Sequence, residues 1–188
     1  MKIVGRVFLI IGCLLILSPI LKILSMQIQS QKSLQQWNQS LELENKNSIP
    51  SSIQDTEARL GEAIGTLSYS NQPMLAVIEG ITPEELEKGL GHDPLSRLPG
   101  EFGNCLIYGH REQFLWKLQF IEVGDIIEIQ IKSEMLQYKV DNILILNPTD
   151  TKIFEETDYP SLTLVTCYPF IYFGTTEERF VVKASLQN

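Results

Sequence analysis

Cysteine and histidine, the residues of a thiol-based catalytic site, are few in this sequence. The chain contains three cysteines, Cys13, Cys105 and Cys167, and two histidines, His92 and His110. These numbers are too small for a disulfide framework or for two zinc sites. A cysteine nucleophile is commonly activated by a histidine that accepts and returns a proton. The first question is therefore which cysteine the fold could bring to which histidine.

Cys167 and His110 occupy matching places at the ends of two predicted strands. Cys167 ends the apolar run LTLVTC just before a Tyr-Pro pair, where proline stops the strand ladder. His110 ends the run CLIYGH, and Arg179 opens the last predicted strand with donors that could stabilise a thiolate or an oxyanion. This arrangement fits a thiolate and imidazole pair. Composition alone leaves a core thiol and a surface histidine as the alternative.

The other three candidates favour structural explanations. Cys13 lies inside a long apolar segment, where a thiol behaves as a small hydrophobic group. Strict alternation puts Cys105 on the opposite strand face from His110, which predicts a core thiol instead of a second nucleophile or a disulfide partner of Cys167. His92 follows a predicted helix end and is expected to be a structural or rim residue.

The elements that must position these residues are mostly strands. From about residue 54 the chain consists of short β-rich runs separated by Gly, Pro, Asn and Asp, at 64–70, 74–80, 105–110, 125–133, 136–147, 162–169 and 179–186. A helix is predicted to start at Thr82-Pro83 and to end near Gly89 or Gly91, and further short helical turns are predicted at 113–118 and 151–157. Roughly seven or eight strands at this spacing indicate a barrel or a sandwich. We expect a mostly antiparallel β-barrel with short helices in its connections.

The amino-terminal segment predicts a membrane anchor. Residues 7–24 read VFLIIGCLLILSPILKIL, which is about the minimum length for crossing a hydrocarbon core of roughly 30 Å. A cleaved signal peptide, the competing interpretation, needs a shorter apolar run and a clear cleavage site. Lys2 and Arg6 outnumber Lys22 on the other flank, which favours a cytoplasmic amino terminus. We expect residues 1–24 to form a cytoplasmic tip and an uncleaved transmembrane signal anchor.

Residues 25–53 predict a stem. They are rich in Gln, Ser and Asn, so a solvated spacer is the favoured interpretation, although Leu34, Trp37 and Leu41 follow helical spacing and leave an amphipathic helix open. The domain proper is then 54–188.

The charge balance excludes one class of partner. The formal net charge is −8, and the 12 basic and 23 acidic residues beyond residue 24 give that part −11. A nucleic-acid-binding surface needs the opposite balance, so nucleic acid is not an expected partner.

Several motifs, in order, resemble one known family. These are a TPEE helix running into GLGHDP, the segment LPGEFGNCLIYGHR, a strand introduced by Gly124-Asp125, the run TLVTCYPF, and an arginine opening the last strand. Together they resemble the sortase family, most closely its class D type, over nearly all of 57–188 and the anchor. The resemblance implies an eight-stranded sortase barrel with His110 as the catalytic histidine, Cys167 as the nucleophile and Arg179 as the active-site arginine.

The resemblance also implies a reaction and partners. Sortases cut a sorting signal of the LPxTG kind between Thr and Gly and hold the acyl part on the cysteine as a thioester. An amine of the cell-wall peptide or of another protein then releases it. The expected partners are sorting-signal proteins, a peptidoglycan amine acceptor and the cytoplasmic membrane, with the catalytic domain outside the cell. Two alternatives stay open: a cysteine peptidase that hydrolyses the same intermediate, and a non-catalytic membrane-anchored β-barrel binding module.

Further residues are expected around this site. Arg179, with a backbone N–H near Thr166 or Cys167, is expected to hold the substrate carbonyl and its oxyanion. Candidates for the lining of a groove for the Leu-Pro part of a signal are Leu75, Val77, Ile107 and Val165. No cofactor is expected.

An acidic cluster precedes the strand that carries Cys167. It consists of Glu155, Glu156 and Asp158. Some sortases bind calcium through acids near the active site. A solvated acidic loop is the favoured interpretation here, so no metal is expected.

Overall fold

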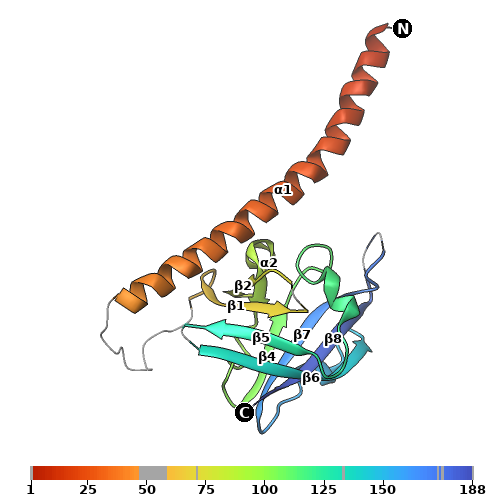
Figure 1. Ribbon diagram of the computed structural model, residues 1–188. Helices are drawn as coiled ribbons and strands as arrows, with labels where there is room; N and C mark the ends of the chain where they lie inside the picture. Colours follow the sequence, from red (N-terminus) through yellow and green to blue (C-terminus); the bar gives the residue numbers. More distant parts are fainter. Residues whose placement is uncertain are drawn as a thin grey trace.

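The strands of this protein close into a barrel. The computed structural model describes residues 2–46, 59–70, 72–132, 134–172, 174 and 176–187. Within them, eight strands form a closed barrel in the order β1-β2-β3-β4-β7-β8-β6-β5, and β5 pairs back onto β1 (Figure 1). The strands are β1 Ala63–Tyr69, β2 Leu75–Glu79, β3 Leu90–His92, β4 Gly103–Tyr108, β5 Ile126–Ile131, β6 Glu134–Leu146, β7 Pro160–Tyr168 and β8 Glu178–Leu186. The predicted mostly-β barrel is confirmed.

Two strand pairs within the barrel are parallel. They are β2 with β3 and β4 with β7, while the remaining neighbours run antiparallel. The carboxyl ends of two parallel neighbours lie at the same edge of a sheet, whereas those of two antiparallel neighbours lie at opposite edges. The β4–β7 pair therefore brings two chain segments that are far apart in sequence out of the barrel at one place.

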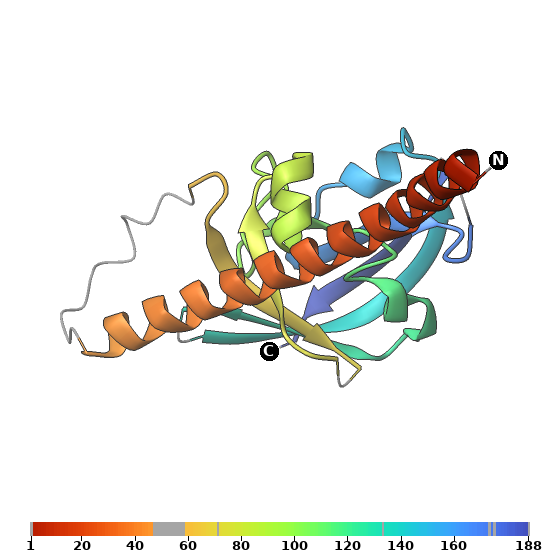
Figure 2. The same ribbon diagram turned by 90° about the horizontal axis from the view of Figure 1, so that it is seen from above.

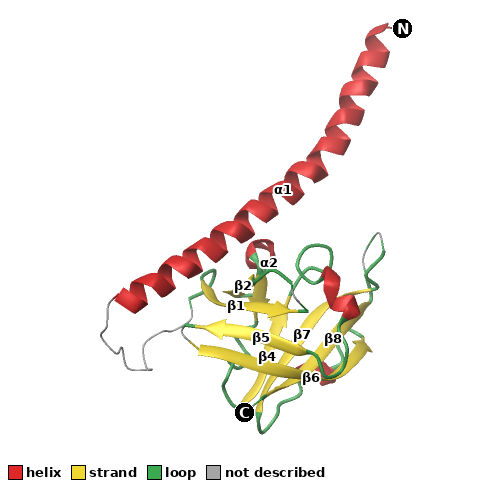
Figure 3. Cartoon of the chain, in the orientation of Figure 1, coloured by secondary structure: helices red, strands yellow, loops and turns green. Residues whose placement is uncertain are grey.

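Short helices fill the connections, as predicted (Figure 3). Helix α2 covers Pro83–Lys88, and the Thr82 backbone N–H donates to Glu85 Oε2 at 3.0 Å, which is half of a capping box. The predicted turns at 113–118 and 151–157 appear as the 3-10 helices η1 Trp116–Phe120 and η2 Thr151–Phe154. Strand β3 was not predicted, because three residues with a central glycine carry no readable alternation.

The barrel is packed on its inside and, on one side, also on its outside. The interior cluster takes alternate residues from the strands, and several are fully buried, among them Leu67, Leu90, Ile127, Leu162 and Leu164. A second, smaller cluster lies on the outer face of β4, β7 and β8, under helix η2, and consists of Leu106, Ile153, Val165 and Val181. Strands β4 and β7 therefore bury apolar residues on both faces, as strands covered on two sides do.

Helix α1 covers Lys2–Lys46 and continues through most of the predicted stem. It passes against α2, β1 and β2, as Figures 1 and 2 show from two directions. Ser30, Ser33 and Trp37 are buried there, and Trp37 is 6% exposed. Most other described side chains of residues 25–42 are exposed, so this part of the stem has the form of the amphipathic helix left open above: the three buried side chains share one helix face because they are three and four residues apart. Residues 47–53 and the predicted domain start at 54 lie outside the described residues.

The amino-terminal half of α1 is apolar, and most of its described side chains are exposed. Within the described part of the chain, one helical segment, Ile11–Glu42, is long and apolar enough to cross a membrane. The large apolar side chains that the structure describes from Ile11 to Leu24 are exposed, as expected of a helix that has no protein around it. At the end of this apolar stretch, Lys22 Nζ lies 3.5 Å from Glu87 Oε1 of α2.

Candidate active site

The parallel pairing of β4 with β7 puts His110 and Cys167 at one edge of the barrel. Tyr108 lies opposite Val165 in this pair. His110 comes two residues after Tyr108, and Cys167 comes two residues after Val165, so the two occupy corresponding positions on neighbouring segments. Neighbouring backbones in a sheet are about 4.8 Å apart. The pairing continues past the end of β4, since the Gly109 N–H donates to the Val165 carbonyl at 3.1 Å.

Arg179 joins them from the other side of β7. In the antiparallel β7–β8 pair, Arg179 lies directly opposite Cys167. Its guanidinium is half-buried, and Nη1 donates to the carbonyls of Thr176 at 3.3 Å and Glu178 at 2.9 Å. The turn before β8 thus holds this side chain in place. Three residues predicted from separate strand ends meet at one edge.

All three lie on the outer face of the barrel. Residues two apart in a strand share a face. Val165, two residues before Cys167, and Val181, two residues after Arg179, both belong to the outer cluster. Tyr108, two residues before His110, packs against the same cluster. Cys167 and His110 are both half-buried, so the thiol and the imidazole are accessible to a substrate.

Cys105 lies on the opposite face, in the barrel interior, as predicted. It is 1% exposed, and burial raises the pKa of its thiol far above the usual range, with Glu79 and Glu101 adding to the effect. Such a thiol stays neutral and unreactive at physiological pH. All three cysteines are free, and Cys13 is exposed on α1.

Tyr108 belongs to this face, although sequence reasoning did not single it out. It packs against the outer cluster, and burial raises the pKa of its hydroxyl to about 12; the Asp93 carboxylate adds to this rise and the Arg179 guanidinium opposes it. A neutral phenol therefore lies within the field of Arg179. The signal was available in CLIYGH, because residues two apart in a strand share a face and Tyr108 precedes His110 by two.

The residues predicted to line a groove separate into two groups. Val165 lies in the outer cluster, on the same face as Cys167. Val77 and Ile107 are fully buried in the interior cluster, and Leu75 is half-buried against it. Thr166 also points inward, and its hydroxyl donates to the Gly109 carbonyl at 2.8 Å. The structure thus brings Val165 to the site's face and puts the other three apolar candidates with the core.

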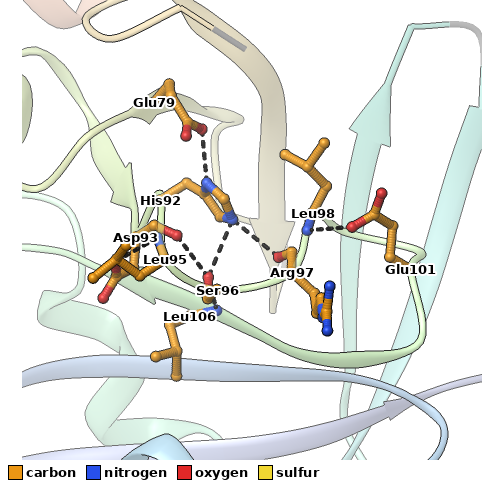
Figure 4. A network of polar contacts seen from close by, with 9 residues as sticks. All are labelled: Glu79, His92, Asp93, Leu95, Ser96, Arg97, Leu98, Glu101 and Leu106. Carbon is orange, nitrogen blue, oxygen red and sulfur yellow. Dashed lines mark hydrogen bonds and ion pairs between the residues drawn. The ribbon is translucent and has the colours of Figure 1, made fainter. Parts of the chain in front are cut away.

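His92 lies in β3 at the centre of a buried polar network (Figure 4). Its Nδ1 is 2.7 Å from Glu79 Oε2, and its Nε2 lies 3.0 Å from the Arg97 carbonyl and 3.2 Å from Ser96 Oγ. His92 is 1% exposed. Both ring nitrogens are engaged, so this histidine holds the segment after β3 and has a structural environment, in contrast to half-buried His110.

The acidic cluster lies after η2, in the connection between β6 and β7. Its members Glu155, Glu156 and Asp158 are exposed. Lys183 donates to Glu155 Oε2 at 3.0 Å, and this bond lowers the pKa of the Glu155 carboxyl. Among the described residues, no group of three or more His, Cys, Asp or Glu side chains has an arrangement that could hold a metal ion. The expectation that no metal takes part stays a prediction.

Comparison with known proteins gives the family of this chain. A family model described as the sortase domain matches residues 70–187. Sortase D of Bacillus subtilis (strain 168) is 31% identical over 124 residues, which are 65% of this chain and 63% of that protein, less than two thirds of its length.

Solved structures show the same likeness. A Clostridium perfringens sortase D5 transpeptidase superposes with a TM-score of 0.70 at 27% identity and covers 85% of this chain and 99% of that one. Clostridium perfringens sortase C, solved with the C-terminal cell wall sorting motif, has a TM-score of 0.64 at 23% identity, over 84% of this chain and 86% of that one. The chain therefore belongs to the sortase family.

Proposed function

We propose that this protein is a cysteine transpeptidase of the class D sortase type. It cleaves a sorting signal of the LPxTG kind between Thr and Gly and transfers the acyl part to an amine of the cell wall or of another protein. The observation that carries the proposal is the convergence of Cys167, His110 and Arg179 on one edge and one face of the barrel. A non-catalytic binding module has no physical need for that set.

In this reaction Cys167 is the nucleophile and His110 the proton carrier. The Cys167 thiolate attacks the carbonyl carbon of Thr, and the bond from that carbon to the Gly nitrogen breaks as the thioester forms. His110, as imidazolium, gives its proton to the departing amine. In the second half the incoming amine attacks the thioester carbon, His110 takes its proton, and the thiolate leaves. The enzyme returns to its starting state.

Arg179 stabilises the charge that develops on the substrate oxygen. A guanidinium directly opposite the nucleophile in the β7–β8 pair can donate to the tetrahedral oxyanion, together with a backbone N–H near Thr166 or Cys167. The carbonyls of Thr176 and Glu178 already orient its plane. Because the donor is held before substrate arrives, little reorganisation is needed during the reaction.

The apolar part of the signal binds along the outer face of β4 and β7. Half-buried Tyr108 lies on this face near Cys167 and packs on the buried outer cluster, to which Val165 and Val181 belong. A Leu-Pro pair presents apolar groups that such a surface would bury. The related sortase C was solved with a cell wall sorting motif, which supports the same class of ligand here.

The enzyme works at the outer surface of the cytoplasmic membrane. The exposed apolar half of α1 is the anchor, and the excess of Lys2 and Arg6 over Lys22 orients the amino terminus towards the cytoplasm. The acidic barrel then lies outside, where sorting-signal proteins and peptidoglycan amines are present.

The proposal is tested with the full chain in detergent micelles. The protein and its Cys167→Ala variant are incubated with a library of sorting peptides, with and without amine acceptors, and the products are identified by mass. Ligated product from the wild type alone establishes transpeptidation and names the motif. Hydrolysis without ligation supports the cysteine peptidase, and no turnover of any peptide supports the binding module.

A further inference from the structure

The residue after His110 is a buried arginine with every guanidinium nitrogen engaged. Arg111 is 3% exposed. Its Nη1 donates to the Pro169 carbonyl at 2.5 Å and its Nη2 to the Tyr172 carbonyl at 2.8 Å, while Nε donates to Glu112 Oε1 at 2.7 Å. Burying a guanidinium is costly unless its donors are satisfied. The two carbonyls at Pro169 and Tyr172 meet that condition.

These two carbonyls belong to the turn that directly follows the nucleophile's strand. β7 ends at Tyr168, one residue after Cys167. Arg111 binds both ends of the next four residues, Pro169 to Tyr172, and so brackets the turn through which the chain leaves the sheet.

A second anchor holds the same turn from within the barrel. Phe170 is 8% exposed and packs edge-on against Phe180, with ring centroids 5.1 Å apart, and against Trp116 at 6.5 Å. The side chain of Phe170 and the carbonyls on either side of it are therefore held by different partners. The turn after Cys167 has little freedom to move.

A second hydrogen bond joins the same two chain segments before His110 and Cys167, as Arg111 joins them after these residues. Thr166, the residue before Cys167, donates to the carbonyl of Gly109, the residue before His110. Arg111, the residue after His110, donates to Pro169, two residues after Cys167. The two chain segments are thus joined both before and after the positions of His110 and Cys167.

We propose that Arg111 is a positioning residue that sets the separation and orientation of His110 relative to Cys167. The proposal rests on the function proposed above, in which these two residues carry out the transfer. Arg111 itself does not contact substrate. A lysine would keep the positive charge, but a single ammonium cannot reproduce the planar fork that bridges two carbonyls on either side of a turn.

The expected signature is a loss in turnover that leaves substrate binding unchanged. A misplacement of about 1 Å between reacting groups can lower a rate on the order of 100-fold. We therefore expect Arg111→Lys to lower kcat by about 10- to 100-fold and to leave KM within about twofold. Glu112→Gln is the matched control, because Glu112 is exposed and contacts the same guanidinium from the solvent side; its kcat should stay within about twofold of the wild type.

The experiment uses the full chain in micelles, in a Cys13→Ser background that leaves Cys167 as the accessible thiol. Three quantities are measured for each variant: kcat and KM with a sorting peptide and an amine, and the rate of Cys167 alkylation by iodoacetamide as a function of pH. The alkylation profile reports the coupling between thiol and imidazole. For Arg111→Lys it should shift towards the profile of His110→Ala, which a purely structural role would not produce.

The kinetic and alkylation measurements can each contradict the positioning role of Arg111. An Arg111→Lys protein with wild-type thermal stability, unchanged kcat and an unchanged alkylation profile overturns the proposal. If that variant does not fold, Phe170→Leu loosens the other anchor of the same turn and should show the same split between kcat and KM; unchanged kcat there also counts against the proposal. Should the wild type ligate no peptide, the proposed function fails, whereas the alkylation profiles still decide the role of Arg111.

Discussion

Replacing Arg179 by lysine separates the charge of this side chain from its geometry. The Arg179 Nη1 is held by the carbonyls of Thr176 and Glu178, and the rest of the guanidinium can serve a substrate at Cys167, directly opposite on β7. A lysine has one nitrogen on a flexible stem. It can satisfy the two carbonyls or reach the substrate oxygen, but not both.

The size of the effect follows from what is lost. Removing one donor to an oxyanion costs about 2.7–4 kcal/mol in the barrier, or on the order of 10²- to 10³-fold in turnover. The folding cost is much smaller, because Arg179 is half-buried and its carbonyl partners can turn to water. We expect a loss of about 1 kcal/mol in the free energy of unfolding, equivalent to roughly 2–4 °C in Tm for a chain of this size.

The assay compares Arg179→Lys with Lys183→Gln. Lys183 lies on the same face of β8, four residues along the strand or roughly 14 Å away, and pairs with Glu155. Its loss removes one positive charge from the same face without touching the site, so turnover should stay near the wild-type value. Initial rates of peptide ligation and thermal unfolding are measured for both variants. Turnover of Arg179→Lys within about fivefold of the wild type would refute the oxyanion role.

Three further outcomes are expected. Cys167→Ala should abolish both ligation and the covalent acyl-enzyme seen by mass spectrometry, and retained cleavage would exclude Cys167 as the nucleophile. Leu164→Ala, at a fully buried position in the barrel, should lower the free energy of unfolding by about 2–5 kcal/mol in denaturant titrations, whereas exposed Val123→Ala should change it by less than about 0.5 kcal/mol. Burial raises the pKa of Tyr108 to about 12, so its contribution to stability is complete below the unfolded pKa of about 10 and is lost as pH rises from 10 to 12. Tyr108→Phe should therefore lose less stability than the wild type across that interval, and equal losses would contradict the assignment.

Local sequence patterns predicted much of the fold. Short β-rich runs separated by turn residues marked the longer strands, and the capping sequence at Thr82 marked α2. The same alternation placed Cys105 on the inner face of its strand. These features depend on residues within a few positions of one another, so a single stretch of sequence contains the information.

Other features had no local signal. Strand β3 is too short for a pattern. Its His92 contacts Glu79 because β3 pairs with β2, where the two residues lie opposite each other. The polar stretch after the anchor looked solvated, because the elements that α1 packs against, α2, β1 and β2, come later in the chain. Arg111 precedes its carbonyl partners by about sixty residues, so its role could not be read from GHR alone.

Local sequence marks the parts of this protein: an apolar helix, a set of strands, and a cysteine, a histidine and an arginine at strand ends. The parallel pairing of β4 with β7, and the position of β8 on the other side of β7, emerge only when the barrel closes. This pairing puts His110 and Arg179 on the two sides of Cys167. Strand order depends on how whole faces pack into a closed barrel, and that is a property of contacts between distant segments, which no local period encodes.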